Sequence, residues 1–219
     1  IKKRRLKKGV QVYFSDNYGY FDRDELYGYQ DDPERFIFFC KTVLETIKTL
    51  NWKPDIIHCH DWHTGLIPVY LKTVLTDDPF FAGIKTVFTI HNLQYQGVCS
   101  AGYMRTAGLD WKLFVPEKLE FYGKLNMIKA GIMYSDVVTT VSSKYAKEIQ
   151  TPVNGVGLAG VLRSRKDNLH GIINGLDYTE WDPQRDKKIA ARFSWNSFDR
   201  RSVNKKRLQQ LFGLPESSS

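Results

Sequence analysis

The stretch from residue 54 to residue 97 constrains the fold more than any other part of the chain. It contains two short apolar runs, residues 54–60 and 84–90, and each ends abruptly in polar residues. Short apolar runs bounded by polar breaks are typical of buried strands. Between them, apolar residues at helical spacing predict a helix over residues 62–75. This order of strand, helix and strand predicts a parallel βαβ unit in an α/β protein.

The rest of the chain continues the alternation of strands and helices. Further strands are predicted over residues 10–14, 137–141 and 169–173, which brings the count to about five. Helices are predicted over residues 31–50, 119–134, 142–149 and 199–212. Residues 98–117 show little periodicity and are expected to form a long ordered loop with room for one short helix. The expected fold is a mostly parallel sheet with helices on both faces.

Polar residues gather where four of these strands are predicted to end. The positions concerned are residues 60–61, 91–92, 142–143 and 174–175. In a parallel sheet the carboxyl ends of the strands lie along one edge, where the ligands of α/β proteins bind. The neighbourhood of Asp61 and His91 is therefore the first candidate for a site. Asp61 is also placed to cap the helix that follows it, and the two roles are compatible.

The composition narrows the class of partner. The formal net charge is +8, with the excess gathered toward the two ends of the chain. Because the basic residues are not interleaved with aromatic residues in an RNA-binding pattern, we expect a solvated surface and no nucleic-acid partner. Three cysteines indicate no disulfide framework and favour a reducing compartment. No apolar run is long enough to span a membrane, so no membrane partner is expected.

Two motifs invite interpretations that their context does not favour. Residues 58–63 hold three histidines and resemble the His-x-His-x-Asp-His run of metallo-β-lactamase-like hydrolases, but the aspartate falls one place early. We expect no metal site, and a metal hydrolase that uses His58, His60 and His63 is the weakest alternative. His58 is expected to pack beneath a helix. Residues 155–160 read Gly-x-Gly-x-x-Gly but follow a helix, which argues against a dinucleotide site.

Several longer motifs closely resemble bacterial glycogen synthases and plant starch synthases. The main ones are HDWHTGL at residues 60–66, FTIHNLQYQG at residues 88–97 and GIINGLD at residues 171–177. Residues 136–143, 157–162 and 181–183 add to the resemblance. It extends from about residue 10 to residue 213, and motifs of this length in this order are specific.

The resemblance implies a glycosyltransferase-B fold, which consists of two Rossmann-like domains with a cleft between them. It implies transfer of glucose from ADP-glucose, or UDP-glucose in some members, to the non-reducing end of an α-1,4-glucan. The anomeric configuration is retained, and neither a metal nor another cofactor is required. By the same resemblance, Asp61 and His91 hold the transferred glucose and Asn174 is a further glucose contact. Asn92, Tyr95 and Gln96 are assigned to the sugar or acceptor side.

The resemblance also implies that the chain is part of a larger enzyme. Residues 1–213 are expected to form most of the N-terminal, acceptor-side domain, with its first strands missing, and residues 214–219 to begin the interdomain linker. The C-terminal Rossmann-like domain is then an expected partner, and the chain alone is expected to lack synthase activity. The compartment implied is the bacterial cytoplasm or a plant plastid. The alternative is a glucan-binding module of the same fold that catalyses nothing.

Overall fold

The computed structural model describes residues 1–6 and 9–216 of the chain. They form two compact units, residues 1–173 and residues 174–219. The last three residues of the expected linker, 217–219, lie outside the described residues. In the described part of the chain, no helix combines the length and the apolar character that crossing a membrane requires.

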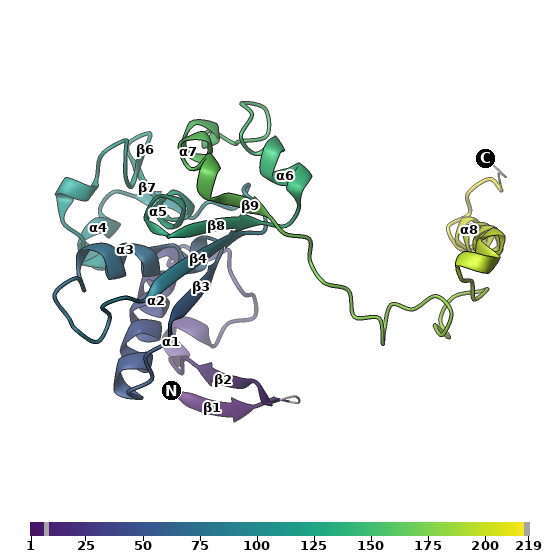
Figure 1. Cartoon of the computed structure of the whole chain (residues 1–219), viewed down its shortest axis with the longest axis horizontal. Helices are drawn as coiled ribbons and strands as arrows, with labels where there is room; N and C mark the ends of the chain where they lie inside the picture. The colour runs from purple at the N-terminus through teal and green to yellow at the C-terminus, as the bar shows by residue number, and fades with distance from the viewer. Residues whose placement is uncertain (7–8, 217–219) are drawn as a thin grey trace. The chain divides into compact units, whose positions relative to one another are not determined.

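A parallel sheet forms the centre of the first unit (Figure 1). Its strands are β3 (Ile56–His60), β4 (Lys85–Ile90), β8 (Val137–Thr140) and β9 (Leu169–Gly171). They lie in the order β3-β4-β8-β9, and every neighbouring pair is parallel. This confirms the α/β class and four of the predicted strands.

Helices α3 (Leu66–Thr73), α5 (Met127–Tyr134) and α7 (Ala159–Ser164) lie side by side over this sheet, and α2 (Asp32–Thr49) packs beside α3. All the crossovers run in one direction along the sheet. Because parallel crossovers are right-handed, they place their helices on the same face. Helices on both faces of the sheet were expected. In the described residues, the layer formed by α2, α3, α5 and α7 lies over one face.

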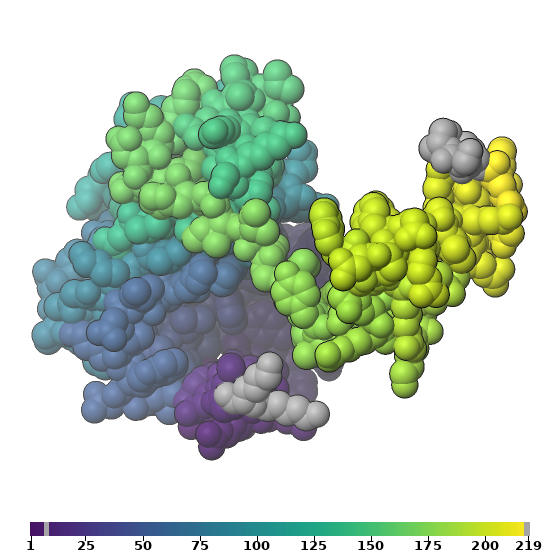
Figure 2. Space-filling model, turned by 45° about the vertical axis from the view of Figure 1, so that its right-hand side comes forward, coloured from purple at the N-terminus to yellow at the C-terminus, as the bar shows by residue number. Residues whose placement is uncertain are grey.

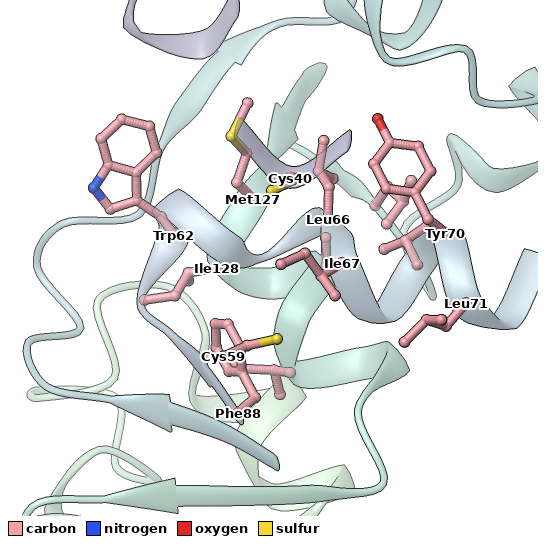
Figure 3. Packing of buried hydrophobic residues seen from close by; sticks show 14 of the residues in the cluster. Cys40, Cys59, Trp62, Leu66, Ile67, Tyr70, Leu71, Phe88, Met127 and Ile128 are labelled. Carbon is pink, nitrogen blue, oxygen red and sulfur yellow. The ribbon is translucent and has the colours of Figure 1, made fainter. Parts of the chain in front are cut away.

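The apolar core lies between the helix layer and the sheet (Figure 3). One row of strand residues in register faces the helices, and it consists of Cys59, Phe88, Val138 and Leu169. Phe88 is fully buried and fills the space above Gly131 of α5, where an added Cβ would lie 2.3 Å from the phenyl ring. Residue 131 therefore has to be glycine for α5 to approach the sheet this closely.

The opposite face of the sheet carries a polar row. His60, Thr89, Thr139 and His170 stand in register across β3, β4, β8 and β9. Thr89 and Thr139 are buried and their hydroxyl oxygens lie 2.6 Å apart, whereas the two histidines are exposed. His58 is on this face too, and it is exposed. The expectation that His58 packs beneath a helix is therefore wrong, because the helix layer lies on the other face.

Residues 98–126 differ from the sequence prediction. They contain strands β5 (Val98–Ser100), β6 (Glu120–Phe121) and β7 (Lys124–Asn126), which form an antiparallel sheet, together with α4 (Tyr103–Ala107) and the 3₁₀ turn η3 (Trp111–Leu113). The helix predicted over residues 119–134 begins only at Met127. Tyr122 and Gly123 have φ values of 49° and 76°, so the chain turns back there as a hairpin and cannot continue a helix.

The first residues of the chain form a hairpin of their own. Strand β2 (Gln11–Phe14) was predicted, but it pairs antiparallel with β1 (Lys2–Arg5) and does not join the parallel sheet. The predicted strand at residues 10–14 is therefore confirmed, but its expected place in the parallel sheet is wrong. All four residues of β1 are exposed, and the hairpin is the purple surface in Figure 2. Helix α1 (Tyr18–Phe21) follows, and its aromatic rings pack against α2.

The remaining helices agree with the sequence. Helix α6 (Ser143–Glu148) begins after Ser142, whose side chain accepts a hydrogen bond from the Tyr145 amide, and a 3₁₀ turn, η4 (Lys166–Asn168), precedes β9. In the second unit, η5 (Trp195–Arg200) leads into α8 (Arg201–Leu211). Gly213 follows α8 with φ of 61°, the left-handed conformation that commonly ends a helix. The predicted helices at residues 142–149 and 199–212 are confirmed.

The close packing of α5 on β4 gives a stability prediction. The substitution Gly131→Ala should lower the free energy of unfolding by about 1–3 kcal/mol, because the new methyl group overlaps the Phe88 ring. Gly160→Ala in α7 is the matched control, since no heavy atom of the described residues outside the backbone of α7 itself and the two chain neighbours lies within 4 Å of the added Cβ. It should be neutral or stabilising by up to about 1 kcal/mol. Urea denaturation of both variants decides the matter, and equal effects would contradict this account of the packing.

Candidate active site

Asp61 joins the ends of β3 and β4. It follows the last residue of β3, and its carboxylate Oδ1 accepts a hydrogen bond of 2.8 Å from the backbone amide of His91, which follows β4. The Asp61 amide donates to the Thr89 carbonyl, and the Asp61 carbonyl accepts from the Thr64 amide. Two residues 30 positions apart in the sequence therefore lie side by side at the carboxyl edge of the sheet.

The backbone of Asp61 is strained. Its φ of 54° and ψ of −175° fall in a region that is populated almost entirely by glycine and costs about 1–3 kcal/mol for other residues. The three hydrogen bonds around the residue hold it there. The expected capping role is wrong, since the Asp61 side chain makes no cap bond to η2 (Trp62–Thr64) and binds the His91 amide instead. Strain of this kind concentrates at functional sites.

Three histidine rings meet at this edge. Nδ1 of His60 lies 3.0 Å from Nε2 of His91, and the rings of His58 and His60 stack with centroids 4.2 Å apart. Nε2 of His58 lies 2.6 Å from the Thr89 hydroxyl. Although the side chains of His58 and His60 are exposed, neighbouring atoms remove part of their hydration. This partial desolvation, followed by repulsion from His91, lowers the pKa of His58. Partial desolvation, followed by repulsion from His58 and then His91, lowers the pKa of His60, against a smaller opposing effect of Asp61.

The fourth histidine of the region points elsewhere. The ring of His63 packs against Trp62, Phe36 and Tyr27, with centroid distances of 4.3, 4.5 and 5.8 Å. It does not join His58 and His60. Among residues 1–6 and 9–216, no group of three or more histidines, cysteines and carboxylates could hold a metal ion. The arrangement therefore gives no support to the metal hydrolase.

A pocket of about 690 Å³ opens beside the loop that follows His91. Its lining combines aromatic rings with side-chain amides, namely those of Tyr27, Tyr95, Tyr103, Trp62, Phe121, Gln30, Gln94 and Gln96. The rings of Tyr27 and Tyr95 lie 6.2 Å apart and are inclined at 55°. Aromatic faces suit the apolar faces of a sugar ring, and amides suit its hydroxyl groups. The lining is therefore typical of a carbohydrate site.

The predicted substrate-binding residues take up different positions. Asn92 is exposed, and its Oδ1 accepts a hydrogen bond from the Gln94 amide, which shapes the loop. Tyr95 is 54% exposed in the pocket wall. Gln96 is buried, and its amide donates to the Val156 carbonyl and accepts from the Asn126 side chain. Asn174 is exposed and begins the second unit.

The sequence prediction missed the residues that build the far wall of the pocket. Tyr27 belongs to a loop near the start of α2. A buried ion pair between Asp32 and Arg35 anchors this loop. Arg35 is 2% exposed and donates to the carbonyl groups of Tyr20 and Leu26, while Asp32 accepts from the amides of Gly28 and Tyr29. The sequence does place these opposite charges three positions apart at the start of a predicted helix, a spacing that favours an ion pair. It does not show that the pair is buried, because burial depends on the tertiary structure.

Comparison with known proteins now identifies the family. A family model described as the starch synthase catalytic domain matches residues 1–164. The chain belongs to the starch synthase catalytic domain family. The fold is that of a part of the glycosyltransferase-B domain pair, since the chain superposes with a TM-score of 0.77 on the catalytic domain of starch synthase IV from Arabidopsis thaliana, which was solved bound to ADP and acarbose. The two are 34% identical, and the match covers 97% of this chain and 44% of the other.

Relatives within the starch synthase family are closer in sequence. The chain is 50% identical over 207 residues to a glycogen synthase of Moorella thermoacetica, covering 94% of this chain and 42% of the relative. It is 47% identical over 215 residues to glycogen synthase 2 of Geobacter sulfurreducens, covering 96% and 44%. The chain thus spans less than half the length of the relatives that it matches.

The buried amide of Gln96 gives a second stability prediction. Gln96→Ala should lower the free energy of unfolding by about 2 kcal/mol, because the Val156 carbonyl and the Asn126 amide lose a buried partner. Gln94→Ala is the control, since Gln94 is exposed and should change stability by less than about 0.5 kcal/mol. Urea denaturation measures both. Equal stabilities would show that Gln96 does not support the pocket wall.

The histidines predict how stability depends on pH. The pKa values of His58, His60 and His63 are lowered, chiefly by desolvation, so the unfolded chain binds more protons than the folded chain as the pH falls through about 6.5. Their contribution is complete above a pH of about 7 and is lost progressively as the pH falls below about 6.5. The urea midpoint should therefore fall over this range, and His63→Gln should reduce the fall. A midpoint that rises as the pH is lowered would contradict the prediction.

Proposed function

We propose that this chain is the acceptor-side part of a retaining glucosyltransferase. The complete enzyme transfers glucose from ADP-glucose to the non-reducing end of an α-1,4-glucan. The observation that carries this proposal is the bond between the Asp61 carboxylate and the His91 amide at the carboxyl edge of the sheet. Membership of the starch synthase catalytic domain family, relatives named glycogen synthase and the ADP-bound relative of known structure support it.

The chemistry suits the residues at this edge. Glucose transfer with retention passes through an oxocarbenium-like transition state and releases a diphosphate, and positioned dipoles and hydrogen bonds stabilise both. Asp61 and His91 are the proposed catalytic residues. The Asp61 carboxylate, fixed by its bond to His91, can accept further hydrogen bonds from sugar hydroxyl groups. A rigid carboxylate also discriminates against sugars that lack a matching hydroxyl group, because its oxygen would remain unpaired.

The aromatic pocket is the proposed glucan-binding surface. Trp62 and Gln94, which line it, lie one and three positions along the chain from Asp61 and His91. Tyr95 is assigned to direct contact with the glucan and Asn92 to the shape of the loop and the sugar side. Gln96 is assigned to support of the wall, because its amide is engaged with Val156 and Asn126. Asn174 is retained as a glucose contact on the strength of its motif alone.

The extent of the domain is part of the proposal. Residues 1–213 are assigned to the N-terminal domain and residues 214–219 to the start of the linker, although the described residues divide into units at residue 173. A second Rossmann-like domain of the same enzyme would complete the donor site. The bacterial relatives favour the bacterial cytoplasm as the compartment, and a plastid corresponds to the plant relative.

A fusion enzyme tests the activity. This chain would replace the matching part of the Moorella thermoacetica glycogen synthase, and transfer from ADP-[¹⁴C]glucose to glycogen would be measured. The fusion should transfer glucose, and Asp61→Asn or His91→Ala should each reduce the rate by at least about 100-fold, because groups that act on the transition state are lost. His170→Ala is the matched control, since it lies on the same sheet at the far edge and should leave the rate unchanged.

The same experiment separates the alternatives. The chain alone should bind maltooligosaccharide, detected by isothermal titration calorimetry, and should transfer no glucose. Transfer by the chain alone would show that no second domain is needed. A folded fusion that binds maltooligosaccharide but transfers nothing would favour the non-catalytic glucan-binding module. Full activity of the Asp61→Asn and His91→Ala fusions would remove these residues from the active site.

A further inference from the structure

We propose that His60 is a positioning residue, whose ring sets the orientation and the protonated nitrogen of the His91 ring. The inference rests on the proposed function, in which His91 contacts the transferred sugar, but the contact between the rings can be tested without any activity. The geometry that carries it is the 3.0 Å separation of His60 Nδ1 and His91 Nε2.

The backbone of His60 is firmly fixed. As the last residue of β3, His60 pairs with Thr89 of β4 in the parallel register. Its amide donates a hydrogen bond of 2.6 Å to the Thr64 hydroxyl oxygen, and that hydroxyl group donates a bond of 2.8 Å to the His60 carbonyl. Thr64 therefore closes the turn on both sides of His60. The fixed backbone sets the direction of the Cα–Cβ bond of His60, so the ring can change its position only by rotation about its χ angles.

The ring of His60 packs against the ring of His58. The His58 ring stacks on it at 4.2 Å with an interplanar angle of 32°. His58 is itself held by the Thr89 hydroxyl at 2.6 Å, and this hydroxyl oxygen lies 2.6 Å from that of the buried Thr139. A chain of contacts thus runs from the buried centre of the sheet through Thr139, Thr89 and His58 to His60. Side chains locked in this way can hold a partner in a productive geometry.

The His60 ring contacts the His91 ring, and the backbone of His91 is held by a separate hydrogen bond. The His91 amide donates to Asp61, so the main chain and the ring of His91 are held by adjacent residues of one turn. Two facing ring nitrogens need one proton between them, because one must donate and the other accept. The contact therefore couples the two tautomers. If Nδ1 of His60 donates, His91 carries its proton on Nδ1, and if Nε2 of His91 donates, His60 carries its proton on Nε2.

The surroundings of the His60 ring favour its neutral form. The titratable groups that act on the His60 ring are His58, His91 and Asp61. Partial desolvation and the two neighbouring histidines lower the pKa of His60, and the attraction of Asp61 is the smaller effect. His60 is therefore neutral near pH 7 and can serve as a hydrogen-bonding partner of His91.

Nuclear magnetic resonance of the chain tests the contact directly. With ¹⁵N-labelled histidine, a scalar coupling across the hydrogen bond should link the ring nitrogens of His60 and His91 in the parent chain. His60→Ala should shift the His91 ring nitrogens toward an exchanging mixture of tautomers. His60→Asn should preserve the parent signals, because an asparagine amide occupies the place of Nδ1. His170→Ala, in the same sheet row, should preserve them too.

The outcomes decide the proposal even if His60→Ala fails to fold, because the coupling is measured in the parent chain and His60→Asn keeps a polar group at the position. Absence of the coupling in the parent, or His91 signals that ignore the loss of His60 in a folded variant, would overturn it. An effect of His170→Ala as large as that of His60→Ala would indicate a general change of the sheet, and would also overturn it.

The fusion enzyme supplies the functional readout. His60→Ala should lower kcat about tenfold while KM for ADP-glucose changes less than about twofold, because the ring contact orients a group that acts in the transition state. His60→Asn should recover most of the rate. Unchanged kcat in His60→Ala would overturn the positioning role. A parent fusion that transfers no glucose would refute the proposed function, and the ring coupling would then still decide the contact.

Discussion

The site depends on the parallel pairing of β3 with β4. This pairing brings the ends of two strands together, so that Asp61 reaches the His91 amide and His60 reaches the His91 ring. The strained backbone of Asp61 is the visible consequence, because the carboxylate can meet the amide only if the chain leaves β3 in a conformation that is unfavourable for aspartate. The energy stored there is offset by the sheet and by the core behind it.

The one-sided arrangement of helices explains the chemistry of the other face. The helix layer buries the row of Cys59, Phe88, Val138 and Leu169, which are apolar and tightly packed. The opposite row can therefore carry histidine and threonine side chains without burying unpaired polar groups. The same sheet thus supplies stability on one face and hydrogen-bonding groups on the other. The histidines of the candidate site belong to the second face.

The pocket shows how distant segments complete a site. Tyr95 comes from the loop after β4, whereas Tyr27 comes from a loop near the beginning of the chain, and the buried pair of Asp32 and Arg35 holds that loop in place. A buried ion pair contributes little net stability, but it fixes one geometry because breaking it leaves an uncompensated charge. Gln96 fixes the other side through Val156 and Asn126. The pocket is thus held by buried polar contacts around an exposed aromatic pair.

By itself, the sequence determined the α/β class, four of the strands, most of the helices and the neighbourhood of Asp61 and His91, because apolar periodicity and polar strand ends are local signals. Only the tertiary structure decided the hairpin at Tyr122 and Gly123, the exposure of His58, the support role of Gln96 and the contact of His60 with His91. Each of these depends on which residues meet across the fold. Local periodicity carries no information about such meetings, since they arise from the register of the strands and from the face on which the helices pack.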